Sequence, residues 1–247
     1  MPGANDPPDG TVSVPRALSK LGVCSRAEGV RLVEASRVRV NGHVVSDTAQ
    51  RITPERDLIE IDGTPIVRAE RVYVALNKPR GLVTTRDDPQ GRPTIYECLK
   101  DATLPFVAPV GRLDKASEGL LLLTNDSRWS AALLDPASHV DKRYHVQIRG
   151  TLDELALARA TSGVVETSTG EQLALKRISL LRTGSRSSAW FEVVLDEGRN
   201  RHIRRVFAIL GVEVLRLVRV AIGPLVLGSL AKGEWRMLTT GEVRALS

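Results

Sequence analysis

One acidic residue, Asp114, stands in a sequence context that suits it to chemistry. It belongs to the segment 111–126, which reads GRLDKASEGLLLLTND. The unbroken apolar run 120–123 predicts a buried strand, so Asp114 lies in a loop directly before a rigid element. Gly111 and Gly119 permit tight backbone on either side of it. A carboxylate placed in this way can act as a base, a nucleophile or a stabiliser of positive charge, although an ordinary turn aspartate fits the same pattern.

Positive charge is concentrated in two parts of the chain. The protein has 35 Lys and Arg against 29 Asp and Glu, which gives a formal net charge of +6. Residues 14–46 contain six basic side chains and two acidic ones, and residues 199–219 contain six arginines and one acid. A basic excess collected in patches favours a polyanionic partner, and nucleic acid is the commonest partner of this kind.

The N-terminal part of the chain predicts a small unit of two helices and a small sheet. Residues 14–21 have the pattern of a short helix, and Ser25 and Glu28 have the spacing of a capping box that starts a second helix. An Asn-Gly pair at the centre of 38–45 predicts a hairpin, and 58–61 predicts a further strand. The basic side chains of this region would then lie mostly on the helices.

From residue 72 onward the chain alternates strands with a few helices, which predicts an α+β domain with a mixed, mainly antiparallel sheet. Strands are expected over 72–76, 144–148 and 212–220, and a helix from Asn200 to Gly211. A long polar loop over 79–93 is of the kind that often carries function. The predicted organisation is a disordered tail (1–12), a small domain (13–61), a linker (62–71) and a larger domain (72–247).

Four motifs, in order along the chain, make it resemble the pseudouridine synthases of the ribosomal small-subunit synthase A and large-subunit synthase B family. Segment 111–121 resembles the family signature G-R-L-D-x-x-[ST]-x-G-L-L, and 76–82 looks like its N-K-P-x-G motif. Segment 142–144 looks like its K-x-Y motif, and 197–205 resembles E-G-R-x-x-x-[IV]-[RK]-R. The first fifty residues resemble the α-L RNA-binding domain, so the resemblance covers nearly the whole chain after Thr11. Segments 85–94 and 198–201 favour the large-subunit branch of the family.

The resemblance implies a role for several side chains. Asp114 would be the catalytic carboxylate, Tyr144 would pack on the target base, and Arg204 would pair with the carboxylate and keep it ionised. Arg112 would enter the RNA stack that the base vacates, with a phosphate contact as the plain alternative. Without the resemblance, Tyr144 is compatible with a core residue and Arg204 with a charge on a helix surface. Further RNA contacts are expected at Arg16, Lys20, Arg26, Arg31, Arg37, Arg80, Arg86 and Arg201.

The implied reaction breaks the N-glycosidic bond of a uridine, turns the uracil and rejoins it through carbon five. The expected partner is ribosomal RNA, and the resemblance favours that of the large subunit. The target uridine would flip out of its stack into a pocket of the enzyme. No cofactor and no metal is expected, and the chain has neither a phosphate-loop motif nor clustered His and Cys ligands.

Two other functions are compatible with parts of the sequence. A non-catalytic RNA-binding or ribosome-assembly factor could share the fold, but the complete set of Asp114, Tyr144 and Arg204 disfavours it. A glycoside hydrolase built on Asp114 would need a second carboxylate across the scissile bond, and only Glu118 lies near it in sequence.

The remaining features favour a cytoplasmic monomer. No stretch approaches the ~20 apolar residues that span a membrane, and the first ten residues lack the apolar core of a signal peptide. Cys24 and Cys98 are too far apart in sequence for a metal-ligand motif or a disulfide framework. No apolar stripe suggests a subunit interface.

Overall fold

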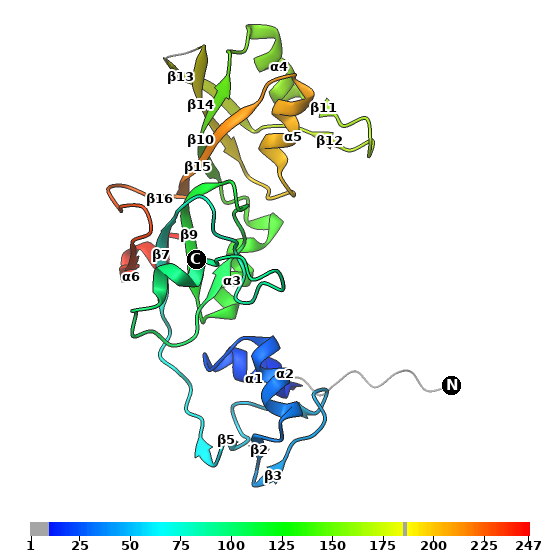
Figure 1. Ribbon diagram of the computed structural model, residues 1–247, viewed down its shortest axis with the longest axis vertical. Helices are drawn as coiled ribbons and strands as arrows, with labels where there is room; N and C mark the ends of the chain where they lie inside the picture. The colour runs from blue at the N-terminus through cyan, green and yellow to red at the C-terminus, as the bar shows by residue number, and fades with distance from the viewer. Residues whose placement is uncertain (1–9, 185–186) are drawn as a thin grey trace. The chain divides into compact units, whose positions relative to one another are not determined.

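The computed structural model describes residues 10–184 and 187–247 (Figure 1). These residues form two compact units, which are treated separately below. The first unit comprises the chain up to Tyr73 with 102–108 and 124–127, and the second comprises 74–101, 109–123 and 128–247.

The first unit contains two helices and two small sheets. Leu18, Val33 and Val38 are fully buried in its core, so the helices pack their apolar sides against the sheet. The strand order is β3-β2-β5-β6 in one sheet, and β1 pairs with β4 in the other. The predicted helices and hairpin are confirmed. The elements are β1 (Val12–Ser13), α1 (Val14–Lys20), α2 (Arg26–Glu34), β2 (Val38–Val40), β3 (His43–Val44), β4 (Arg51–Ile52), β5 (Ile59–Ile61) and β6 (Thr64–Pro65).

Local side-chain chemistry sets the ends of these elements. The Ser25 hydroxyl accepts a hydrogen bond from the Glu28 amide at 3.1 Å, which caps α2. The Glu28 carboxylate accepts from Arg31 Nε at 3.0 Å, so the described contacts form half of the predicted capping box. Asn41 and Gly42 have φ of 51° and 81°, the positive values that a type I′ turn between β2 and β3 requires.

Two of the predicted boundaries need correction. Val12, assigned to the disordered tail, is 6% exposed and pairs with Ile52 across β1 and β4. Residues 1–9 of that tail lie outside the described residues. In the predicted linker, Thr64 pairs with Ile61, because Asp62 and Gly63 form a second turn with positive φ. An Asp-Gly pair is the same turn signal as Asn-Gly and extends the sheet by one strand.

The second unit is built on one large sheet with the strand order β13-β14-β10-β15-β9-β7-β17. Strand β10 pairs antiparallel with β14 and β15, whereas β15 and β9 run parallel. The mixed, mainly antiparallel sheet is as predicted. Its strands are β7 (Tyr73–Lys78), β8 (Ala108–Val110), β9 (Glu118–Thr124), β10 (Lys142–Arg149), β11 (Val164–Val165), β12 (Gln172–Leu173), β13 (Arg177–Gly184), β14 (Ser188–Leu195), β15 (Val214–Ile222), β16 (Leu225–Val226) and β17 (Trp235–Met237), of which β11 and β12 form a separate hairpin.

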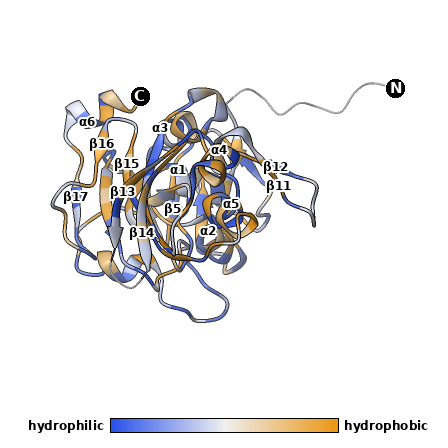
Figure 2. Ribbon diagram, turned by 90° about the horizontal axis from the view of Figure 1, so that it is seen from above, coloured by the Kyte–Doolittle hydropathy of each residue, from blue (hydrophilic) through white to orange (hydrophobic). Residues whose placement is uncertain are grey.

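Helices cover one face of the strands β13, β14, β10 and β15 (Figure 1). Val146 and Ile148 of β10 point to this face and are fully buried against Val206 and Phe207 of α5 and their neighbours. Figure 2 shows both hydrophobic (orange) and hydrophilic (blue) residues along α5, as expected for an amphipathic helix. The helices are α3 (Ser127–Leu134), α4 (Glu154–Ser162), α5 (His202–Ile209) and α6 (Thr240–Ala245), with 3₁₀ helices η1 (Ile95–Leu99) and η2 (Pro136–Ser138).

Helix α5 starts two residues later than predicted, at His202 instead of Asn200. The residue before it, Arg201, has φ of 48° and provides no side-chain cap. Within the described residues, no helix is both long and apolar enough to cross a lipid bilayer.

Strands β9 and β15 approach each other closely at Gly119. Gly119 pairs with Arg219 and has φ of +100°. A Cβ atom on Gly119 would lie 2.3 Å from the carbonyl oxygen of Arg219, which is far inside van der Waals contact. Only glycine therefore permits this pairing between the two parallel strands.

We expect Gly119→Ala to lower the free energy of unfolding by about 2–4 kcal/mol, since it adds a backbone clash to an unfavourable φ. Gly150 is the matched control, because its φ is +78° and nothing lies within 4 Å of the position that a Cβ atom would take there. Gly150→Ala should cost only about 1 kcal/mol. Urea denaturation measures both values, and equal losses would show that the close approach contributes nothing.

Candidate active site

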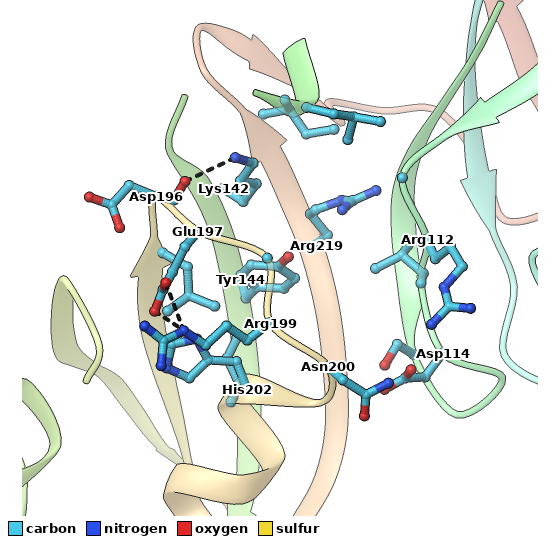
Figure 3. A pocket seen from close by; sticks show the side chains of 18 of the residues that line it. Arg112, Asp114, Lys142, Tyr144, Asp196, Glu197, Arg199, Asn200, His202 and Arg219 are labelled. Carbon is cyan, nitrogen blue, oxygen red and sulfur yellow. Dashed lines mark hydrogen bonds and ion pairs between the residues drawn. The ribbon is translucent and has the colours of Figure 1, made fainter. Parts of the chain in front are cut away.

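A cavity of about 540 Å³ opens in the second unit (Figure 3). Its walls are the loop 110–117, the end of α3, the segment 195–203, and strands β10 and β15. Of the residues predicted to act together, Asp114 and Tyr144 line this cavity, and so do Arg112 and Arg201.

The loop that carries Asp114 is held through its backbone. The Gly81 amide donates to the Lys115 carbonyl at 2.8 Å, and the Thr84 hydroxyl donates to the Leu113 carbonyl at 2.6 Å. The Ser117 amide donates to the Asp114 carbonyl at 2.9 Å. These bonds tie the loop to the long loop 79–93 and leave the Asp114 carboxylate, which is 33% exposed, free to face the cavity.

A buried ammonium group supports the same loop. Lys78 has no exposed surface, and its Nζ donates to the carbonyls of Asp114 at 3.2 Å, Ser117 at 2.9 Å and Pro79 at 3.1 Å. Burial lowers the pKa of Lys78 to about 8, while the charge of Asp114 opposes this shift. The lysine of the N-K-P motif therefore acts on the backbone around Asp114, a role that the sequence did not reveal.

Arg204 also contacts this loop, but it does not form the predicted ion pair with Asp114. Its Nη2 donates to the Ala116 carbonyl and its Nη1 to the Val214 carbonyl, both at 3.1 Å. The ion pair of the Asp114 carboxylate is with Arg201, whose Nη1 lies 3.8 Å from Oδ2. Arg204 thus joins α5, β15 and the loop through backbone oxygens, and burial lowers its pKa.

Tyr144 lies on the inner face of β10. Its neighbours across the sheet are Val193 on β14 and Arg219 on β15. The ring packs against the apolar core on one side and lines the cavity on the other (Figure 3). This position suits the predicted contact with a flat base.

The other arginines of segment 197–205 are held by carboxylates. Arg205 donates to Glu166 at 2.9 and 2.6 Å, which lowers the pKa of Glu166 to about 2. Arg199 donates to Glu197 at 2.8 Å and to Glu171 at 3.0 Å. These pairs fix the segment against the hairpin β11–β12 and leave Arg201 as the arginine nearest Asp114.

Besides Arg201, three further predicted RNA contacts of the second unit are exposed. Arg112 lines the cavity, Arg80 lies in the long loop, and the guanidinium carbon of Arg86 lies 4.6 Å from the ring centroid of Tyr96. The structure does not gather them around Asp114 in one cluster, since Arg112 is the only one of the three that lines the described cavity.

The five basic residues of the first unit that were predicted to contact RNA divide into two groups. Arg31 pairs with Glu28, and Arg37 donates to both oxygens of Asp62 from Nε, at 3.0 and 3.1 Å. Three others are exposed and form no ion pair with any residue in 10–184 or 187–247, namely Arg16, Lys20 and Arg26.

Glu118, the only companion carboxylate that the sequence offered, is not available for chemistry. It is 2% exposed and pairs with Arg216 at 3.0 Å and with Lys232. It does not line the cavity. The part of the chain that the structure describes also contains no group of three or more His, Cys, Asp or Glu residues that could hold a metal ion.

The cavity residues that were not predicted as site residues include two cations, Arg219 and Lys142, the latter identified only as part of the K-x-Y motif. A signal for Arg219 existed, because it lies two residues after Leu217 on a strand whose other cavity-lining residues, Leu217 and Ile222, are apolar. An arginine in such a position is rarely placed there without a partner.

We expect Lys78→Met to lower activity more than tenfold and stability by about 1–3 kcal/mol, because three loop carbonyls would lose their donor. The matched control is Lys115→Met, since Lys115 is exposed in the same loop. Turnover and chemical denaturation measure the two effects. Full activity of the Lys78 variant would show that the loop holds its shape without the ammonium group.

The fold and the cavity agree with comparisons to known proteins. The family model described as RNA pseudouridylate synthase matches residues 72–209, and the S4 domain matches residues 14–58. The chain is 37% identical over 236 residues to an uncharacterized RNA pseudouridine synthase of Aquifex aeolicus, with 95% of this chain and 93% of that protein covered. It is 33% identical to the ribosomal large subunit pseudouridine synthase B of Bacillus subtilis, with 94% and 93% covered.

A solved structure of a pseudouridylate synthase has a similar fold. The crystal structure of a pseudouridylate synthase superposes with a TM-score of 0.67 at 29% identity, covering 96% of this chain and all of the other. The family model alone spans more than half of the 247 residues. The chain therefore belongs to the RNA pseudouridine synthase family of isomerases and carries an N-terminal S4 domain.

Proposed function

We propose that this protein converts a uridine of large-subunit ribosomal RNA to pseudouridine, with Asp114 as the catalytic carboxylate. The observation that carries the proposal is the Asp114 carboxylate at the wall of a cavity, on a loop whose backbone is fixed by Lys78, Gly81, Thr84 and Arg204. The large-subunit assignment is supported by the relative from Bacillus subtilis.

The chemistry follows from the groups in the cavity. The target uridine leaves its stack, which costs a few kcal/mol and least in loops and bulges, and its base enters beside Tyr144. Asp114 then faces C1′ of the sugar, where positive charge develops as the glycosidic bond breaks. The carboxylate can bond to C1′, balance its charge or take a neighbouring sugar proton. Arg201, whose Nη1 lies 3.8 Å from Oδ2, places a positive charge beside this carboxylate.

In this proposal Arg204, the arginine of the family motif, positions the loop of Asp114 and does not pair with its carboxylate. Arg204 fixes the Ala116 carbonyl, two residues after Asp114, and joins it to β15 at Val214. Because a misplacement of about 1 Å can cost 10²-fold in rate, such a backbone contact is sufficient to make Arg204 essential. Arg112, Arg80, Arg86 and Arg201 would contact the phosphates or the stack around the flipped uridine.

The S4 domain supplies a second RNA contact in this proposal. Phosphate contacts from its basic helices would hold the register of the RNA without reading its bases. We infer that the protein works as a monomer on cytoplasmic ribosomal RNA.

Replacement of Asp114 tests the role of the carboxylate. Asp114→Asn should lower the rate of pseudouridine formation at least about 10³-fold and leave RNA affinity within about threefold, since the change removes a charge at the reacting carbon. Asp135→Asn is the control, because Asp135 lines the same cavity and caps η2 through Oδ1, a contact that asparagine retains.

The target is found by carbodiimide mapping of ribosomal RNA from cells that lack the protein. One signal in large-subunit RNA should disappear and should return with the wild-type protein but not with the Asp114→Asn variant. A lost signal in small-subunit RNA would overturn the large-subunit assignment, and an unchanged map would contradict the enzymatic proposal as a whole.

Salt dependence of RNA binding tests the role of the first unit. Replacement of Arg16, Lys20 or Arg26 by Gln should each reduce the slope of log affinity against log salt by about 0.7–0.9, because each releases about one counterion from the RNA. Arg37→Gln should have a smaller effect, since Asp62 already occupies its guanidinium. An equal or larger effect of Arg37 would show that RNA displaces Asp62.

A further inference from the structure

Arg219 is a buried cation with an unused donor. It is 6% exposed, and its Nε donates to the Leu120 carbonyl at 2.7 Å. Its Nη2 is buried and has no hydrogen-bond partner in the described chain. A buried charged donor without an acceptor is costly, and Arg219 lines the cavity, so a group bound there can complete the hydrogen bonds of this guanidinium.

The position of Arg219 relates this donor to the base. Arg219 on β15 pairs with Tyr144 on β10. Two residues away on each strand, Leu217 pairs with Val146. Leu217 and Val146 are both in the core on the inner face, so the alternation of the strands places Arg219 and Tyr144 on that face as well. Figure 3 shows both side chains at the cavity.

Lys142 adds a second cation to the same wall. It lies two residues before Tyr144 on β10, on the same face, and its Nζ donates to the Asp196 carbonyl at 3.1 Å. An ammonium group has two further donors. Burial lowers the pKa of Lys142, and the charge of Arg219 lowers it further. Because the positive charges of Lys142 and Arg219 repel each other, they favour the binding of a negatively charged group between them.

We propose that Arg219 is a further catalytic residue, which with Lys142 binds a carbonyl oxygen of the uracil and stabilises the negative charge of the detached base. The inference rests on the proposed function. It adds a group that acts on the base, whereas Asp114 acts on the sugar.

The electrons in this step are balanced as follows. The C1′–N1 bond breaks and both electrons stay with the base, whose charge spreads from N1 to O2 and O4. The Asp114 carboxylate compensates the electron deficit at C1′. After the base turns, C5 donates an electron pair to C1′ and the new bond forms. The proton on C5 then leaves and N1 regains a proton, so no oxidant or reductant is needed.

The burial of Arg219 favours the base over a phosphate as its ligand. The base is the part of a flipped nucleotide that enters deepest, while the phosphates remain on the solvent side. Arg219 is 94% buried beside the residue proposed to stack on the base, whereas exposed arginines such as Arg112 and Arg201 are available to the backbone.

The test compares two leaving groups under single-turnover conditions. The substrate is a synthetic RNA segment that carries the mapped uridine, or 5-fluorouridine at that one position, because fluorine stabilises the negative charge of the detached base. Conversion is followed as the loss of uridine or of 5-fluorouridine by liquid chromatography and mass spectrometry of the nucleosides, since the product of uridine has the same mass and 5-fluorouridine has no C5 proton to release. Arg219→Met should slow conversion of uridine about 100-fold, in the range expected for removal of one donor to a developing anion. With 5-fluorouridine the loss should be tenfold or less, because the base then stabilises its own charge.

Companion variants separate the contributions. Arg219→Lys should recover part of the rate because it restores the charge, and Lys142→Met should cause a smaller loss that is not additive with Arg219→Met. The control is Arg149→Met, an exposed arginine on β10 that pairs with Glu213 outside the cavity, and it should leave the rate unchanged.

Three results would overturn the inference. An equal loss on both substrates together with a lower melting temperature would assign Arg219 a structural role. Weaker binding with a salt slope reduced by about 0.9 would assign it to a phosphate. Full activity of Arg219→Met would show that Arg219 has no catalytic role, and the proposed function of the protein would still stand. A wild-type protein that converts no uridine would instead refute the proposed function, and this inference with it.

Discussion

The hydrogen bonds of one buried ammonium group are the interaction on which the site depends. Lys78 has no exposed surface and donates to three carbonyls, two of which belong to the loop of Asp114. A charged group in this position is costly to bury unless its donors are used. The surrounding bonds from Gly81, Thr84 and Arg204 act on the same backbone, so the carboxylate is positioned by main-chain contacts.

Asp114 and two of the cations that line the cavity lie on different walls. Asp114 lies on the loop wall, whereas the half-buried Lys142 and the buried Arg219 lie on the sheet wall. This separation matches a reaction that creates a positive centre on a sugar and a negative one on a base. Each centre would then lie next to a fixed charge of opposite sign.

The sequence predicted the parts of the structure that depend on local rules. The Asn41-Gly42 turn, the two N-terminal helices and the buried strand after Asp114 follow from backbone preference and periodicity, and all are present. The family motifs also identified the residues that line the cavity at Asp114 and Tyr144.

What failed depends on contacts between distant parts of the chain. The partner of Arg204 is a carbonyl 88 residues away, and no pattern in the sequence distinguishes a backbone acceptor from a carboxylate. Val12 was assigned to a polar tail because its strand partner, Ile52, lies 40 residues further on. Arg219 was overlooked because a single arginine among apolar residues was interpreted as part of a basic cluster and not as an inward-facing group.

The contact of β9 with β15 at Gly119 limits how the cavity can change shape. The backbones of the two strands are in close contact at this point, and the Arg219 side chain donates a hydrogen bond to the carbonyl of Leu120, the residue after Gly119. The loop of Asp114 leads directly into β9, so the carboxylate and the guanidinium are attached to one stiff pair of strands. In the function proposed above, the flipped nucleotide enters a gap whose width these strands set, and selectivity for the small pyrimidine ring can come from that width before any hydrogen bond to the base is made.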